Sequence, residues 1–171
     1  LDISGAVSIS CWVKITNNPS SGQYYGLVCK GGINTAISDT ATQYVLWYDN
    51  DGTYRVHFGI RGTGVWKDNT YNFQLTPGTW YHLVGVYDPS NEVSLWVNNV
   101  KQATNTTSIP ASLVNTAQPF VIGNMYSGTP GMYADVEIDE VGIWDKKISD
   151  AEISDLYNSG SGIPYEVPTV V

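Results

Sequence analysis

The feature that most constrains the fold is a set of short runs in which apolar and polar residues alternate. The first run, residues 7–15, alternates the apolar side chains of Val7, Ile9, Cys11, Val13 and Ile15 with polar or aromatic neighbours. Successive side chains of a β-strand point to opposite faces, so this period of two predicts a strand with one buried face. Because similar runs recur along the chain, we expect an all-β domain.

Turn signals separate several of the later runs. Residues 49–52 read Asp-Asn-Asp-Gly between "QYVLWY" and "YRVHFGI", and residues 88–91 read Asp-Pro-Ser-Asn between "TWYHLVGVY" and "EVSLWVNN". Such turn residues between two strand-like runs predict β-hairpins. A last long strand is predicted in "MYADVEIDEVGIW". The absence of alternating strands and helices argues against a doubly wound fold.

One short C-terminal helix is predicted near residues 149–157. Ser149 and Glu152 have the spacing of a capping box, and Ile148 and Ile153 are placed as a hydrophobic staple. Many strands and a single short helix predict a two-sheet antiparallel jelly-roll β-sandwich.

The length of 171 residues suits one domain, which we expect to span residues 1–160. Residues 161–171 are rich in Gly, Ser and Pro and are predicted to be a linker or C-terminal tail.

The net charge of −8 argues against a nucleic-acid partner and is compatible with cation binding. No apolar run approaches the roughly 20 residues that span a bilayer. We expect a monomeric module attached to other domains of a larger secreted or cell-surface protein.

Five segments, in order along about residues 5–160, carry a recognisable combination of motifs: "VSISCWVKI", "GLVCKGG", "GTWYHLVGVYDPSNEVSLWVNN", "PFVIGN" and "IDEVGIWDKKISDAEISDLYNSG". Together they resemble the laminin-G-like or concanavalin A-like lectin-glucanase jelly-roll domains. The resemblance implies one concave and one convex antiparallel sheet. It also implies a binding module, often for glycans and sometimes for proteins.

Three carboxylates lie within four residues of the last strand, at Glu137, Asp139 and Glu140. Glycosidases of the resembling superfamily place Glu, Asp and Glu on one strand at i, i+2 and i+4, or at i+5 with a bulge. Strict alternation puts Glu140 on the face opposite to Asp139. Val141 stands at i+4 and Gly142 at i+5, so the catalytic spacing is broken and we expect no enzyme activity.

The resemblance also implies a structural calcium ion, held in related jelly rolls by an Asp that matches Asp139. The candidate co-ligands are backbone carbonyls, Asp2 or residues 30–34, since calcium takes six to eight oxygen ligands. The alternative is that Asp139 caps a loop through backbone amides. Residues 49–52 lack the acidic ligand of a calcium loop at its twelfth position, where Ile60 stands, and are predicted to be only a turn.

Aromatic residues make up 12% of the chain, more than a core of this size requires, so some rings should be exposed. Sugar sites pair flat rings with polar groups. Trp66 falls in a glycine-rich predicted loop, residues 61–69. Its ring is expected either to be exposed or to fold back as a lid on the core. Trp80 is expected in the core. The predicted ligand site comprises Trp66, Arg55, His57, Arg61, Trp47 and Trp96, the last two on outward strand faces.

Cys11 and Cys29 are the two cysteines. If their strands are antiparallel neighbours, the two residues lie opposite each other and form a disulfide; free buried thiols are the alternative.

We expect a non-catalytic carbohydrate-binding module. A protein-binding adhesion domain or structural spacer is the alternative function.

Overall fold

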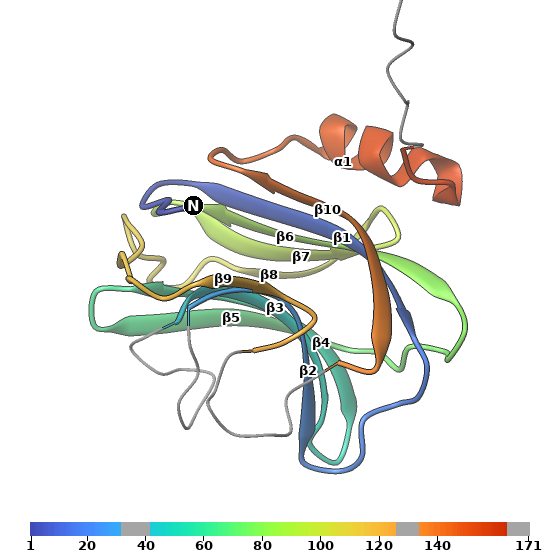
Figure 1. Ribbon diagram of the computed structural model, residues 1–171. Helices are drawn as coiled ribbons and strands as arrows, with labels where there is room; N and C mark the ends of the chain where they lie inside the picture. Colours follow the sequence, from blue (N-terminus) through green and yellow to red (C-terminus); the bar gives the residue numbers. More distant parts are fainter. Residues whose placement is uncertain (32–41, 126–133, 164–171) are drawn as a thin grey trace, which may run out of the picture.

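The computed structural model describes residues 1–31, 42–125 and 134–163, which fold into two packed antiparallel five-stranded sheets (Figure 1). Sheet A has the strand order β10 (Val136–Trp144), β1 (Val7–Ile15), β6 (Trp80–Asp88), β7 (Glu92–Val97) and β8 (Val100–Asn105). Sheet B has the order β5 (Val65–Asn72), β4 (Tyr54–Gly62), β3 (Thr42–Asn50), β2 (Gln23–Gly31) and β9 (Phe120–Ile122). The predicted jelly-roll β-sandwich is confirmed.

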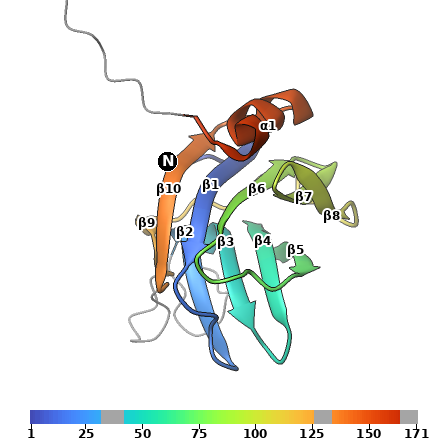
Figure 2. The same ribbon diagram turned by 90° about the vertical axis from the view of Figure 1, so that its right-hand side faces the viewer.

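The alternating runs form the core between the two sheets. The five apolar side chains of β1 are each at most 1% exposed and pack against inward residues of sheet B, among them Tyr44, Leu46 and Phe58. Both predicted hairpins are confirmed, since β3 pairs with β4 and β6 pairs with β7 across the expected turns. The side view shows the two sheets as separate layers (Figure 2).

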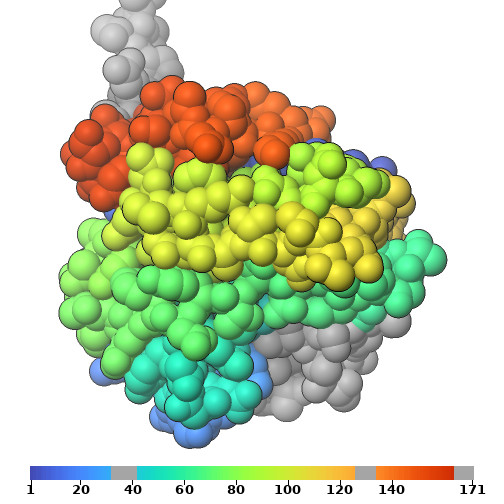
Figure 3. All heavy atoms as spheres, turned by 180° about the vertical axis from the view of Figure 1, so that it is seen from behind, coloured from blue at the N-terminus to red at the C-terminus, as the bar shows by residue number. Residues whose placement is uncertain are grey.

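Helix α1 (Asp150–Tyr157) covers the outer face of sheet A and confirms the predicted helix. The Ser149 hydroxyl accepts a hydrogen bond from the Glu152 amide, and the Glu152 carboxylate accepts one from the Ser149 amide, as the capping box requires. Ile148 and Ile153 are buried in one cluster with Val84, Val86 and Trp96 of the sheet. The helix, in red, lies above the yellow-green strip that holds β7 and β8 (Figure 3).

A short 3-10 helix, η1 (Asn158–Gly160), follows α1 and leads into the turn at residues 161–163. The predicted tail at residues 161–171 lies outside the described residues from 164 onward. No helix in the described part of the chain is both long and apolar enough to cross a membrane.

The predicted disulfide is wrong, because the two cysteines belong to different sheets. Strand β1 pairs with β10 and β6, whereas β2 pairs with β3 and β9. Cys11 points into the core between the sheets, and Cys29 packs with Val45 and Trp47 on the outer face of sheet B. Both thiols are free and buried, and burial raises the pKa of each to about 12.

Two local predictions are also wrong. Residues 61–69 are not a long loop, since β4 continues to Gly62 and β5 begins at Val65 after a tight turn. Trp80 is not in the core, because its ring lies on the outer face of sheet A at the start of β6 and is 37% exposed. In both places hydrogen-bonded pairing between strands, rather than local composition, decides the structure.

Candidate functional site

The outer face of sheet B gathers five of the six residues predicted for the ligand site. Alternation turns Arg55, His57 and Arg61 of β4 outward, and register places them beside outward residues of β3 and β5. We call the following side chains the sheet B face: Trp47, Asp49, Arg55, His57, Arg61, Trp66, Asp68 and Thr70.

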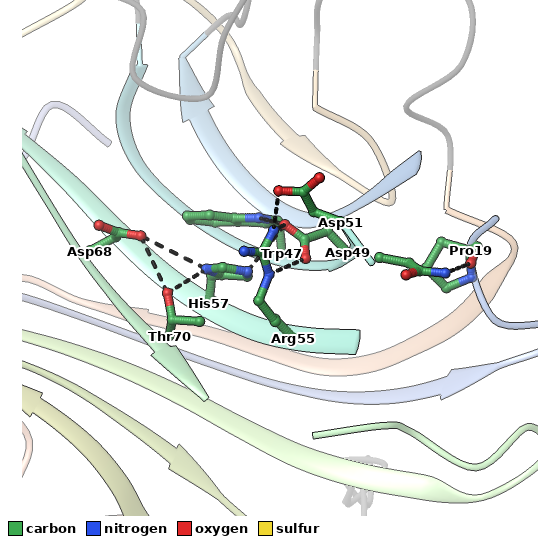
Figure 4. Close-up of polar contacts among 9 residues, drawn as sticks. Pro19, Trp47, Asp49, Asp51, Arg55, His57, Asp68 and Thr70 are labelled. Carbon is green, nitrogen blue, oxygen red and sulfur yellow. Dashed lines mark hydrogen bonds and ion pairs between the residues drawn. The ribbon is translucent and has the colours of Figure 1, made fainter. Parts of the chain in front are cut away.

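Asp49 is the centre of a polar network on this face (Figure 4). Its two carboxylate oxygens accept hydrogen bonds from Arg55 Nε at 2.9 Å and Arg55 Nη2 at 3.1 Å, while the Trp47 indole Nε1 donates at 3.2 Å. His57 Nε2 lies 3.1 Å from Asp49 Oδ2. Burial alone would raise the pKa of Asp49, but the contacts with His57 and Arg55 outweigh it and hold the pKa below its usual value. Asp49 is therefore a buried, paired carboxylate.

His57 connects the two edges of the network. Its ring stacks on the Trp47 indole with centroids 4.2 Å apart and planes 4° apart. Its Nδ1 lies 2.9 Å from the hydroxyl of Thr70 and 3.8 Å from a carboxylate oxygen of Asp68. These contacts on both ring nitrogens fix the orientation of the imidazole, so the strands β3, β4 and β5 share one rigid layer of side chains.

Trp66 packs on this layer because Gly59 leaves room for it, with its ring tilted 44° from that of Trp47. A Cβ added at Gly59 would come within 2.4 Å of the Trp66 ring and 3.1 Å of the Trp47 ring. The Arg61 guanidinium lies 5.7 Å from the centroid of Trp66, within cation–π range. Trp66 is half-buried, so one face of the indole packs on the sheet while part of the ring stays accessible. It is neither a free ring on a loop nor a lid on the core.

The sheet B face thus has a buried support and an accessible surface. Trp47, Asp49 and His57 are at most 4% exposed and hold the layer in place. Asp68 and Thr70 stand beside Trp66 on the outward side of β5 and present a carboxylate and a hydroxyl to solvent. A flat ring beside fixed hydrogen-bonding groups can bind a polar ligand that has one apolar face.

Asp49, Asp68 and Thr70 are members of the site that the sequence prediction lacked. Alternation was the available signal for Asp49, because it puts Asp49 on the same face of β3 as Trp47; the turn predicted at residues 49–52 did not give its partner on β4, since the strands pair with Asp49 opposite Arg55. Asp68 and Thr70 had no such signal, because residues 61–69 were predicted to be a loop.

Trp96 does not lie with the other five predicted residues. It is on the outer face of sheet A, 7% exposed, and packed with Ile148 and Ile153 beneath α1. Its outward direction on β7 was predicted correctly, but the helix covers that face. The Lys101 ammonium lies 5.8 Å from its ring centroid.

The carboxylates of β10 depart from strict alternation. Trp12 pairs with Asp139 and Ser10 pairs with Gly142, so two residues of β10 stand opposite one residue of β1 in a β-bulge. Glu140 adopts a left-handed φ of 48° in this bulge. Asp139 and Glu140 consequently line the same surface cavity, and the prediction that they point to opposite faces is wrong. Val141 packs against the core, as alternation around the bulge requires.

The two residues predicted to bind calcium are separate. Asp2 pairs with Lys30 at 3.0 Å, and the Lys30 ammonium also donates to the carbonyls of Thr116 and Gln118. An ammonium therefore already supplies positive charge to this group of oxygens. Asp139 lies on β10, and within the described ranges no group of three or more His, Cys, Asp or Glu side chains is arranged to hold a metal ion. Since calcium takes six to eight oxygens, these residues do not form a fitting site by themselves.

Comparison with protein families gives one match over most of the chain. The model described as the concanavalin A-like lectin/glucanases superfamily matches residues 1–154. No curated protein sequence matches this chain.

Solved structures with the same fold have low sequence identity to this chain. A native heptameric SAP-like pentraxin from Limulus polyphemus has a TM-score of 0.65 and 16% identity, over 94% of this chain and 72% of its own. The sialidase CBM40 of Ruminococcus gnavus, bound to α2,3 sialyllactose, has a TM-score of 0.69 and 14% identity, over 89% and 82%. The binding domain of Paraclostridial Mosquitocidal Protein 1 has a TM-score of 0.69 and 15% identity, over 92% of this chain and 38% of its own.

Proposed function

This chain belongs to the concanavalin A-like lectin/glucanase superfamily, and we propose that it is a non-catalytic carbohydrate-binding module. The proposed ligand is a glycan that binds across β4 and β5 on the sheet B face. The fold also occurs in a sialidase carbohydrate-binding module and in a toxin binding domain, which supports a binding role.

The observation that carries the proposal is the position of Trp66. Its indole packs against Gly59, and Asp68 and Thr70 are the outward neighbours along the same strand. A pyranose ring presents an apolar C–H face and a rim of hydroxyls, which matches an aromatic platform bordered by hydrogen-bonding groups. Arg55 and Asp49 hold the support rigid, so little side-chain entropy is lost on binding.

A catalytic role is not supported by the carboxylates of β10. Around the bulge, the outward position beyond Glu140 is Gly142, which carries no side chain that could act as an acid or a nucleophile. We further propose that the domain is a module of a larger secreted or cell-surface protein. Structural calcium stays a prediction made from the resemblance, and no step of glycan binding is assigned to it.

Affinity electrophoresis on a panel of neutral and acidic polysaccharides tests the function. We expect at least one polysaccharide to retard the protein, and a Trp66→Ala variant to lose most of that retardation because the platform is removed. Trp144→Ala is the matched control, since it removes another half-buried indole that lies away from the sheet B face. Equal thermal unfolding of the two variants is required for the comparison.

Retardation that persists in Trp66→Ala would remove the sheet B face as the site. A protein that no glycan of the panel retards would contradict the glycan-binding function itself and would favour the adhesion or spacer alternative.

A further inference from the structure

A second surface feature lies on the outer face of sheet A, on the opposite side of the sandwich from the sheet B face. It is a cavity of about 200 Å³ lined by Trp12, Trp80, Asp139, Glu140, Gly160 and Ser161, which we call the sheet A cavity. Its residues come from the adjacent strands β10, β1 and β6 and from the turn after α1. Pockets for drug-sized ligands begin near 300 Å³, so this volume suits a single small ring.

The cavity is negatively charged. Neither Asp139 nor Glu140 has an ion-pair partner within the described ranges. The nearby Lys14 ammonium is 2.8 Å from a carboxylate oxygen of Glu137 and lies over the Trp80 ring, 4.9 Å from its centroid, so it borders the cavity but is paired with Glu137. A ligand entering here meets two carboxylates whose charge is not compensated by the described residues.

Both carboxylates are held in position by backbone amides. Asp139 Oδ1 accepts a hydrogen bond from the amide of Glu140 at 2.8 Å, and Glu140 Oε2 accepts one from the amide of Ile163 at 2.8 Å. Gly162 lies close to Glu140, since a Cβ there would come within 2.4 Å of the carboxylate oxygen Oε1. Each carboxylate retains a second oxygen, so both can still accept a hydrogen bond from a ligand.

The other walls are aromatic. Trp80 is 37% exposed and lines the cavity together with Trp12. Trp12 is 7% exposed and stacks on Tyr157 with centroids 5.8 Å apart, which fixes its ring. The Trp12 indole Nε1 is buried and has no hydrogen-bond partner among the residues that the structure describes. A buried donor without an acceptor is unfavourable, and a ligand that supplies an oxygen would relieve this.

We propose that the sheet A cavity binds a protonated amino sugar. Its ammonium is placed between Asp139 and Glu140, and the C–H face of its ring lies on Trp80. A neutral sugar would leave the two carboxylates without a counter-charge, and a bare divalent ion would gain little from the two indoles. The inference rests on the proposed function only in that the ligand is a glycan, because the cavity shares no residue with the sheet B face.

Calorimetric titration of the whole chain, in chelator so that metal ions do not contribute, tests this proposal. The probes are a β-1,4-linked glucosamine oligomer with protonated amines, its N-acetylated counterpart and a β-1,4-linked glucose oligomer, which share one skeleton and differ in charge. We expect the glucosamine oligomer alone to bind the cavity. Glu140→Gln and Asp139→Asn keep an acceptor oxygen for the backbone amide but lose the charge, and each should weaken binding about tenfold.

Asp145→Asn is the matched control, since Asp145 is an exposed carboxylate just after β10 that does not line the cavity, and it should bind like the unmodified chain. Trp66→Ala should also keep its affinity for the glucosamine oligomer, even where it no longer binds neutral glycans. Binding of the N-acetylated oligomer that Glu140→Gln weakens as much as it weakens binding of the glucosamine oligomer, or equal loss in Asp145→Asn, would overturn the proposal. A lysine oligomer that binds as tightly as the amino sugar would also overturn it, because the cavity would then select charge alone.

Discussion

Asp49 illustrates how a single residue supports a surface that it does not itself present. It is 1% exposed, yet four contacts from Trp47, Arg55 and His57 converge on its carboxylate. The charged form is favoured by these contacts, so the interaction depends on pH. Losing one partner of a buried, charge-assisted group costs more than losing an exposed ion pair, because the remaining partner is left unsatisfied.

Asp49→Asn should lower the free energy of unfolding at pH 7 by about 2 kcal/mol. The pKa of Asp49 is depressed in the folded state, so its contribution is present above the unfolded pKa of about 3.9 and is lost as the pH falls below that value. Chemical denaturation between pH 7 and pH 2.5 measures both effects. The variant should show a shallower loss of stability below about pH 4. An identical acid profile for variant and unmodified protein would contradict the role given to this carboxylate.

Asp139 carries the prediction of calcium binding. If Asp139 holds calcium together with ligands other than Asp2, calcium added at millimolar concentration to chelator-treated protein should release heat and raise the unfolding temperature, and Asp139→Asn should abolish both effects. Asp2→Asn separates the second predicted ligand, which pairs with Lys30. If neither heat nor a thermal shift is seen with the unmodified chain, the prediction fails.

At the scale of elements, α1 shows how local signals and packing act together. The capping box and the staple were readable in the sequence, but eight residues are too few for a stable isolated helix. Burial of Ile153 against sheet A supplies the remaining stabilisation. Lys146 and the amide and hydroxyl of Ser149 lower the pKa of Glu152 to about 2, so the capping carboxylate is charged at neutral pH.

Ser149→Ala removes the acceptor for the Glu152 amide and should cost about 1 kcal/mol of unfolding free energy. Ile153→Ala should lower the free energy of unfolding by about 3 kcal/mol, because it removes the buried side chain that packs between the helix and sheet A. Urea denaturation of both variants measures the two values. Asp155→Ala, on the exposed side of the helix, serves as the control and should change little. An Ile153→Ala cost no larger than that of Ser149→Ala would show that packing does not dominate.

At the scale of the whole molecule, the sandwich separates features that the sequence places near each other. Cys11 and Cys29 are 18 positions apart, yet β1 and β2 belong to different sheets, and one thiol lies in the core while the other lies beyond sheet B. The two proposed glycan sites are likewise on opposite outer faces, so one module can hold two ligands independently.

Two free thiols per chain should be alkylated in denaturant without reductant, detected as the corresponding mass increase. Native protein at pH 8 should react slowly, because burial raises the pKa of both thiols to about 12 and little thiolate forms. Finding no alkylation in denaturant would mean that the cysteines are oxidised and that the separation of β1 and β2 is incorrect.

The sequence by itself determined which side chains of the alternating strands face the core and which local turns form. The alternation in residues 7–15 and 54–60, the two hairpin turns and the Ser149 cap each depend on neighbours within a few positions, so they can be recognised without a tertiary structure. The same alternation correctly turned Arg55 and His57 outward, although it could not give the register that pairs them with Asp49 and Trp47.

Only the tertiary structure decided which strands share a sheet and what covers each outer face. Trp47 and Trp96 have the same alternation signal, yet one joins the sheet B face and the other lies beneath α1. Strict alternation also did not predict the β-bulge at Glu140. Because of this bulge, the two adjacent carboxylates of Asp139 and Glu140 line the same cavity. Strand pairing joins residues far apart in the chain, so the local pattern around each residue cannot specify its neighbours.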